Sequence, residues 1–370
     1  MLRMKNAIGN GEPRLLVLVM MVVAMAAFAA TSARAGSDER KGTAGAMELS
    51  IPIGPRGTAL GGAIGSDASG IEAMFWNPAG LANTPGTEAL FSHTAYFADM
   101  KVNYTGIATK AGGFGTVGLA AKILSIGDIV VTTEQAPDGT GEILDPTFAV
   151  MGLSWGKAFT DRVNFGTTVN YVHEAIANNN ASGVGFDFGV QYDAGWHGAR
   201  FGLAVKNIGG SMSFSGPGFE EQARDPNADP NAGNRTVSFS SADFEMPTSI
   251  ALSGSAVVNR NNVSQILALA AFQNNGFSGD QLRGGLEWGY KNMLALRGSY
   301  FGTFNGTTDQ STGEETFKFG SGDDIYQGFA LGAGVTTRLG DASRLGVDLS
   351  WRPTKAEFDD IVEFAVRMNF

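Results

Sequence analysis

The chain has 370 residues, a formal net charge of −10 and no cysteine. An acidic chain without a basic stretch argues against nucleic-acid binding, and the lack of cysteine excludes disulfides and thiolate metal sites. Glycine supplies 52 residues while charged residues make up only 17%, so the composition favours an all-β protein with tight turns over a helical bundle or a disordered chain.

The first 35 residues predict a secretory signal peptide. Basic residues precede an apolar run over 15–30, and the pattern Ala33-Arg34-Ala35 follows. A basic region, an apolar core and an A-x-A pattern in this order are typical of a signal peptide. The alternative, a membrane-spanning helix, needs ~20 apolar residues, which is longer than this run. We therefore expect cleavage near Ala35 and export in a Gram-negative-type bacterium.

The next stretch, from Gly57 to Gly86, reads GTALGGAIGSDASGIEAMFWNPAGLANTPG. Its glycines and its Asn-Pro step interrupt any long helix or strand, yet its large apolar residues argue against a solvated linker. We predict a compact, buried, irregular segment with a short helix that begins at Pro78 and is capped by Asn77. Its small residues, Gly61, Gly62 and Gly65, predict close packing against whatever surrounds it.

From residue 88 onward, apolar and polar residues alternate with a period of two, which predicts strands with one apolar face. The expected strands are 88–97, 102–110, 115–134, 147–157, 163–173, 183–192, 199–207, 248–258, 264–273, 281–290, 294–301, 328–339, 343–351 and 360–370.

Two features favour a membrane barrel over a soluble β-sandwich. The count is fourteen, and bacterial single-chain outer-membrane barrels have an even number of strands. The connections after even-numbered strands are short, whereas the long ones all follow odd-numbered strands: 135–146, 174–182, 208–247 and 302–327. Short periplasmic turns and long outer loops produce this parity. We therefore predict an all-β fold, a 14-stranded antiparallel transmembrane β-barrel, with both ends of the mature chain at the periplasmic side.

The last strand places Phe364, Val366, Met368 and Phe370 on one face. Alternating apolar residues that end in phenylalanine resemble the assembly signal that outer-membrane barrels present to the barrel-assembly machinery. The expected surroundings of this barrel are outer-membrane lipid and lipopolysaccharide.

A second resemblance lies in the stretch from Gly42 to Ala82. Its WNPAGLA core, preceded by the run Asp67-Ala68-Ser69, resembles the N-terminal region of the PorV/PorQ family, which is related to the FadL long-chain fatty acid transporters. Members of this superfamily are similar in having fourteen strands and an N-terminal plug inside the barrel. The resemblance implies a plug over 36–87 and a barrel over 88–370. It assigns the plug motif to Asp67, Phe75, Trp76, Asn77, Pro78 and Gly80.

The resemblance leaves two functions open. FadL-like proteins carry hydrophobic molecules passively across the outer membrane, which makes hydrophobic small molecules one class of partner. PorV-like members serve type IX secretion, which makes secreted proteins the other class. The loop SMSFSGPGF is expected to expose Met212, Phe214 and Phe219, which mildly favours a contact surface for such proteins.

The resemblance leads to two further expectations, one for the ionic partner of Asp67 and one for the strand that contains Gly127. We expect Asp67 to pair with an inward-facing arginine such as Arg283, Arg297 or Arg367. Lateral release through the wall needs a broken strand, and Gly127 with Asp128 interrupts the longest predicted strand. Because glycine inside a strand commonly marks a bulge or bend, we predict a break there, either a lateral opening or a plain bulge.

The remaining polar motifs predict no catalysis. Asp225 to Asn231 alternate like the start of a calcium loop, but Pro230 and Thr236 replace the turn glycine and the bidentate glutamate of an EF-hand, so a polar surface loop is the preferred interpretation. The three histidines have no metal-ligand spacing, and no Gly-x-Ser-x-Gly or His-Glu-x-x-His motif is present. We therefore expect no enzyme activity, no cofactor and no metal.

Overall fold

The computed structural model describes residues 40, 42–196, 198–223, 233–308, 315–320, 325–340 and 343–370. The predicted signal peptide with its cleavage site near Ala35 lies outside these residues, and so does the calcium hypothesis at Asp225 to Asn231.

Fourteen antiparallel strands close into a barrel, which confirms the predicted fold class. Sequential barrel strands pair with each other, and the pairing of β1 with β19 closes the ring. The barrel strands are β1 (Thr87–Ala95), β2 (Lys101–Lys110), β3 (Thr116–Ser125), β6 (Thr147–Ala158), β7 (Val163–Ile176), β8 (Asn179–Asp193), β9 (Arg200–Gly209), β12 (Ser249–Arg260), β13 (Ser264–Asn275), β14 (Asp280–Tyr290), β15 (Leu294–Thr308), β17 (Phe329–Leu339), β18 (Ser343–Arg352) and β19 (Ile361–Asn369).

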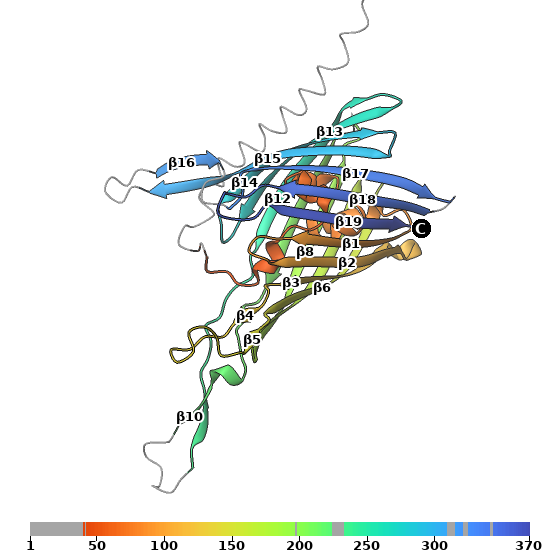
Figure 1. Cartoon of the computed structure of the whole chain (residues 1–370). Coiled ribbons are helices and arrows are strands. Elements are labelled where there is room, and N and C mark those ends of the chain that lie inside the picture. Colours follow the sequence, from red (N-terminus) through yellow and green to blue (C-terminus); the bar gives the residue numbers. More distant parts are fainter. Residues whose placement is uncertain are drawn as a thin grey trace, which may run out of the picture.

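The five remaining strands lie outside the ring of fourteen. β4 (Ile129–Val130) pairs with β5 (Ile143–Leu144), and β10 (Glu220–Ala223) pairs with β11 (Arg235–Ser238). β16 (Glu315–Gly320) pairs only with the far end of β15. Figure 1 shows these strands beyond one end of the barrel, whereas the C-terminus lies at the opposite end with the short turns. The predicted segregation of long and short connections is therefore present. The prediction that both ends of the mature chain lie at the end with the short turns is wrong, because Arg40 and Ala44 contact Glu245 in the long connection between β9 and β12.

Residues that alternate along each strand face opposite sides of the wall. In β19, Val362 and Phe364 point outward and are 41% exposed each, whereas the intervening Glu363 is 1% exposed and faces the lumen. Leu119 and Met151 repeat this outward exposure on β3 and β6. The outer surface of the wall is apolar, and the polar members of each strand are covered from inside, which is the reverse of a soluble barrel.

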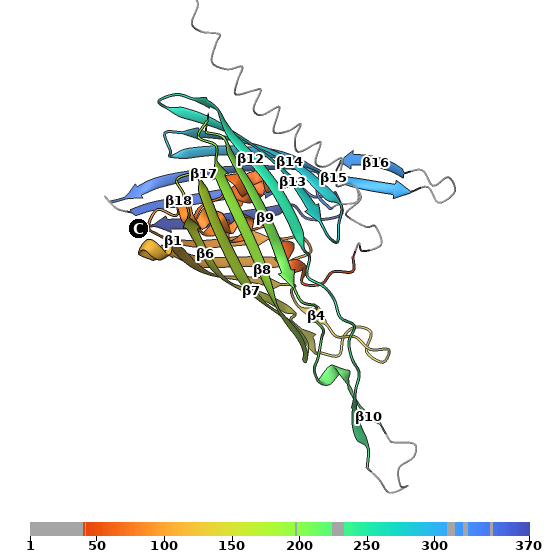
Figure 2. The same cartoon turned by 180° about the vertical axis from the view of Figure 1, so that it is seen from behind.

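The lumen is filled by residues 46–84, which we call the N-terminal segment. Its helices are η2 (Met47–Ser50), α2 (Pro55–Ala59), η3 (Ala63–Ser66), η4 (Gly70–Glu72), α3 (Ala73–Trp76) and η5 (Pro78–Asn83). α2 packs against β15 and β17–β19, η3 against β8, β9 and β12–β14, and η5 against β3 and β6–β8. Both views show the orange coils of this segment enclosed by strands (Figures 1 and 2).

Two short 3-10 helices, η6 (Gly112–Phe114) and η7 (Pro217–Phe219), complete the secondary structure outside the lumen. Across the described ranges, every helix is too short or too polar to traverse a lipid bilayer.

Candidate functional site

Asn77 fixes the N-terminal segment both to itself and to the wall. Its side chain is fully buried and caps η5 by accepting a hydrogen bond from the N–H of Ala79 at 3.2 Å, which confirms the predicted cap. Its amide nitrogen donates to the carbonyls of Gly65 at 2.9 Å and Val190 at 3.1 Å. One residue therefore satisfies backbone groups of two parts of the segment and of strand β8.

Small residues allow the segment to touch the wall directly. A Cβ atom added to Gly80 would overlap the backbone of Ala68, and one added to Gly166 of β7 would overlap the backbone of Pro78. Gly61 and Gly62 adopt positive φ, and a side chain at either would meet Ser299 or Arg283 of the wall. The close packing that the sequence predicts at these glycines is present.

Wall carboxylates accept hydrogen bonds from the backbone of the segment. Glu363 accepts from the N–H of Gly54 at 2.6 Å and from the hydroxyl of Thr58 at 2.8 Å. Glu88 accepts from the N–H of Ile71 at 2.8 Å. Irregular backbone buried inside a barrel needs such partners, because it lacks the hydrogen-bond ladder that satisfies a strand.

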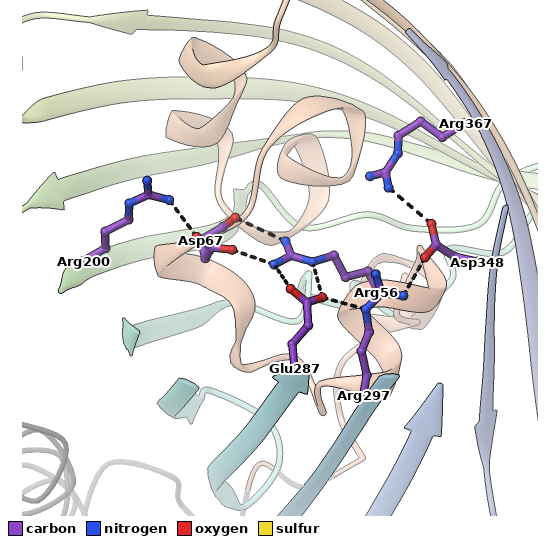
Figure 3. A network of polar contacts seen from close by, with 7 residues as sticks. All are labelled: Arg56, Asp67, Arg200, Glu287, Arg297, Asp348 and Arg367. Atoms are coloured by element: carbon purple, nitrogen blue, oxygen red, sulfur yellow. Dashed lines mark hydrogen bonds and ion pairs between the residues drawn. The ribbon is translucent and has the colours of Figure 1, made fainter. Parts of the chain in front are cut away.

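A chain of ion pairs joins the segment to inward-facing residues of β9, β14, β15, β18 and β19 (Figure 3). Arg56 of α2 lies 2.6 Å from Asp67 and 2.9 Å from Glu287. Arg297 joins Glu287 at 2.7 Å to Asp348 at 2.5 Å. The chain ends at Arg367, 3.3 Å from Asp348, and at Arg200, 2.7 Å from Asp67. We call these seven residues the anchor network.

The anchor network corrects the expected partners of Asp67. Arg56 and Arg200 hold this carboxylate, whereas the expected Arg297 and Arg367 bind Asp348. The third expected arginine, Arg283, donates to Gln281. Arg56 lies 11 residues before Asp67 in the sequence, so it reaches this carboxylate once α2 and η3 fold back on each other.

The rings of Phe75 and Trp76 meet edge to face, with centroids 4.9 Å apart and planes at 87°. The indole N–H of Trp76 donates to the carbonyl of Ile53 at 2.9 Å, so this ring is fixed within the segment. The Phe75 ring instead faces two wall lysines, with the ammonium nitrogens of Lys122 and Lys206 at 4.6 Å and 3.6 Å from its centroid.

Two lumenal cavities meet at Phe75. The cavity that we call the cationic chamber has a volume of about 70 Å³ and is bounded by the segment and by β9, β12–β14 and β18. The second has a volume of about 40 Å³ and lies toward β2, β3 and β6–β9. Phe75, Lys206 and Asn207 line both. A larger hollow of about 530 Å³ is lined by residues of β12–β15, among them the exposed Leu286 and Tyr300 of the outer face and Arg283, which also lines the cationic chamber.

Gly127 lies beyond the paired part of the wall. β3 ends at Ser125, where it still pairs with Lys101 of β2 and Thr147 of β6. The strand predicted to reach residue 134 is therefore shorter, and Gly127 with Asp128 forms the link to the β4–β5 hairpin. Gly127 has a φ of +90° and no atom near the position of a Cβ. The break exists, but along its whole length β3 is paired on both sides.

The C-terminal residues of the predicted assembly signal all face outward. Phe364, Val366, Met368 and Phe370 are 41%, 38%, 38% and 52% exposed. β19 pairs on one side with β18 and on the other with β1, so the last strand joins the first.

The aromatic loop after β9 does not present the surface that the sequence indicated. Met212 is buried, and Phe214 is half-buried against Phe244. Both pack with Ala46 and Leu49 at the start of the N-terminal segment. These side chains cover the segment, so the expectation that Met212 and Phe214 are exposed is wrong.

Sequence reasoning missed the lysines beside Phe75 and the arginine Arg352. Each occupies an inward position of a strand whose outward positions are apolar, and a single cation among polar inward residues is a weak sequence signal.

No metal-binding group of three or more His, Asp or Glu side chains occurs among the residues that the structure describes.

No protein-family model and no curated protein sequence matches the chain. Solved structures with the same fold include the CymD monoaromatic hydrocarbon channel, which is 12% identical with a TM-score of 0.55 over 86% of this chain and 98% of that one. A FadL homologue from Pseudomonas aeruginosa is 11% identical with a TM-score of 0.52 over 86% and 98% of the two chains. A deltaS2S3 mutant of the TodX monoaromatic hydrocarbon channel is 13% identical with a TM-score of 0.51 over 86% and 99%. The barrel therefore has the fold of FadL-type channels.

Proposed function

We propose that the chain is an outer-membrane channel for the passive passage of hydrophobic small molecules. The observation that carries this proposal is the pair of lumenal cavities that meet at Phe75, inside a barrel with an apolar exterior. The similarity in fold to hydrocarbon channels supports the same function. A role in receiving secreted proteins loses its support from the aromatic loop, since Met212 and Phe214 pack inward.

In this proposal the N-terminal segment acts as a plug and Phe75 as its gate. The anchor network and Asn77 hold the segment in place, so molecules cannot pass freely between the segment and the wall. Phe75 is the one aromatic side chain of the plug motif that lines both cavities. A change of its rotamer joins the two cavities without moving the backbone, and such side-chain changes need no unfolding of the segment.

The test is uptake of radiolabelled toluene by a Gram-negative host that expresses the full chain, compared with a host without it. We expect faster accumulation with the chain, and a further increase with Phe75→Ala. The matched control is Phe91→Ala, which removes an outward-facing ring that is 44% exposed and lies away from the lumen. Equal uptake with and without a correctly inserted barrel would overturn the proposal.

A further inference from the structure

Two acidic side chains lie side by side where the N-terminal segment begins, at the end of the barrel with the long connections. Glu48 of η2 is 1% exposed, and neither oxygen of its carboxyl group accepts a hydrogen bond from a described residue. Its neighbour is the carboxyl group of Glu174, near the end of β7, which accepts a hydrogen bond from the N–H of Ala46 at 3.1 Å. Two buried carboxylates repel each other. A proton kept on Glu48 and donated to Glu174 removes the repulsion and gives the Glu48 carboxyl its missing partner.

Lys122 of β3 is the other charged side chain that acts on Glu48 within the described residues. Its buried ammonium group donates hydrogen bonds to the backbone carbonyls of Glu48 at 2.7 Å and of Ile51 at 3.0 Å. One positive charge therefore faces two carboxyl groups, and the three groups together are neutral only while the pair holds one proton. The other side chains packed around this turn are apolar: Ala46, Leu49, Val150, Val172, Ala181, Met212 and Met246.

The turn η2 separates the second lumenal cavity, of about 40 Å³, from the outer surface. Leu49 is 4% exposed and lines this cavity together with Lys122. Met47, two residues earlier in the same turn, is 55% exposed. Because only one helical turn lies between the cavity and the surface, displacement of η2 would open the cavity, including the ring of Phe75, to the outside.

We propose that η2 is a lid on the second cavity, and that it opens when the Glu48–Glu174 pair loses its shared proton. This inference rests on the proposed function, because the cavity is part of the proposed route. With the proton in place, the hydrogen bond between the two carboxyl groups holds η2 against β7. Without it, a net negative charge is buried and the two carboxylates repel each other, so η2 moves toward water. The only chemical step is the transfer of one proton to the solvent.

The environment of Glu48 sets the pH range of this change. Burial and the Glu174 carboxylate raise the pKa of Glu48 from 4.5 to about 8 in the closed lid. An open lid exposes the carboxyl group to water and returns its pKa to the ordinary value. Between these two values, each pH unit therefore raises the ratio of open to closed lid by up to about tenfold. The lid is closed in acid and opens as the pH rises toward 8.

The chain has no cysteine, so a single introduced thiol can report the opening of the lid. Leu49→Cys places the thiol on the buried side of η2, and Met47→Cys places it on the exposed side. Each full barrel, in nanodiscs, is treated with methyl methanethiosulfonate, a small neutral reagent, and labelling is followed by intact mass spectrometry. The labelling rate of Leu49→Cys divided by that of Met47→Cys corrects for the effect of pH on the reactivity of a thiol.

We expect this ratio of rates to rise at least about tenfold from pH 6 to pH 9. It should stay low at both pH values when Glu48→Gln is added, because glutamine can donate a hydrogen bond to Glu174 but cannot ionise. Glu142→Gln is the matched control, since it removes an exposed carboxylate next to β5 and should leave the rise unchanged. A ratio that does not change with pH, or one that rises equally with Glu48→Gln, would overturn the inference.

A second measurement avoids any change at the buried position, in case Leu49→Cys prevents assembly. A nitroxide attached to Met47→Cys should become more mobile from pH 6 to pH 9, and Glu48→Gln should abolish this change. Constant mobility of the nitroxide in the presence of Glu48 would contradict the lid. Neither measurement uses a transported molecule, so the lid can fail while toluene uptake succeeds, and toluene uptake can fail while the lid responds to pH.

Discussion

Two sets of buried charges face the N-terminal segment, and they differ in whether their charges are paired. In the anchor network every arginine lies within ion-pair distance of a carboxylate, and Glu287 and Asp348 each bind two arginines. In the cationic chamber, Lys206 and Arg352 lie over aromatic rings and form no salt bridge within the described residues, and the Asp187 carboxylate attracts Lys206 from farther away. Both sets lie between the same segment and the same wall.

The difference separates two uses of buried charge. A buried pair is specific in geometry, and its loss leaves an uncompensated charge behind, so the anchor network fixes the segment in one place. A buried cation that forms no ion pair with the segment contributes nothing to that fixation. On this view the anchor network holds the segment in place, whereas the cations of the chamber do not.

The largest expected effect comes from breaking the anchor network at its centre. Arg297→Met leaves Glu287 and Asp348 each with one partner fewer at positions that are about one-tenth exposed. We expect a loss of about 3–5 kcal/mol in the free energy of unfolding, measured by denaturant titration in detergent micelles. Lys206→Met is the matched variant and should cost less, because Lys206 forms no salt bridge within the described residues and attracts the Asp187 carboxylate only from farther away. If both variants cost the same, the distinction between the two sets is wrong.

The second prediction concerns a buried carboxyl whose charge depends on pH. Burial and the neighbouring Glu174 carboxylate raise the pKa of Glu48 from 4.5 to about 8. The protonated side chain therefore favours the folded state. This stabilisation is complete below about pH 4.5 and is lost as pH rises through about 8, at up to ~1.4 kcal/mol per pH unit.

The measurement is the thermal unfolding midpoint at pH 6 and at pH 9 for the wild type and for Glu48→Gln. Glutamine keeps the shape of the protonated acid but cannot ionise, so the variant should lose less stability between the two pH values. The same pH dependence in both proteins would contradict the assignment of a proton to Glu48 in the folded state.

Much of this fold follows from period-two alternation, because each strand has an apolar outer face and a polar inner one. Even short strands such as β1 were predicted to within a few residues. The end of β3 was missed, since the apolar residues Ile129 and Val130 continue the alternation into a separate hairpin. The cap at Asn77 was predicted because it depends on adjacent residues alone. The partners of Asp67 and the chamber residues were not, because they depend on which strands meet the segment from opposite sides.

The third prediction tests how far the segment depends on Asn77 in addition to the anchor network. Asn77→Ala removes the cap of η5 and leaves the carbonyls of Gly65 and Val190 without this donor. We expect a loss of about 2 kcal/mol in the free energy of unfolding. Asn262→Ala is the control, because that side chain is exposed in the turn between β12 and β13 and should cost about 0.5 kcal/mol or less. A loss no larger than that of the control would show that the other contacts hold the segment without Asn77.

The smallest effect is expected at Gly127, which lies outside both sets of charges. A route through the lumen past Phe75 does not involve the link after β3, whereas lateral release at a break in that strand would. Because open space surrounds the Cβ position, Gly127→Val should cost only local backbone strain at its positive φ and leave toluene uptake unchanged. Gly166→Val is the contrasting variant, since a side chain there overlaps the backbone of Pro78 and should displace the segment. Uptake abolished by Gly127→Val in a normally assembled barrel would move the route from the lumenal cavities to the wall beside β3.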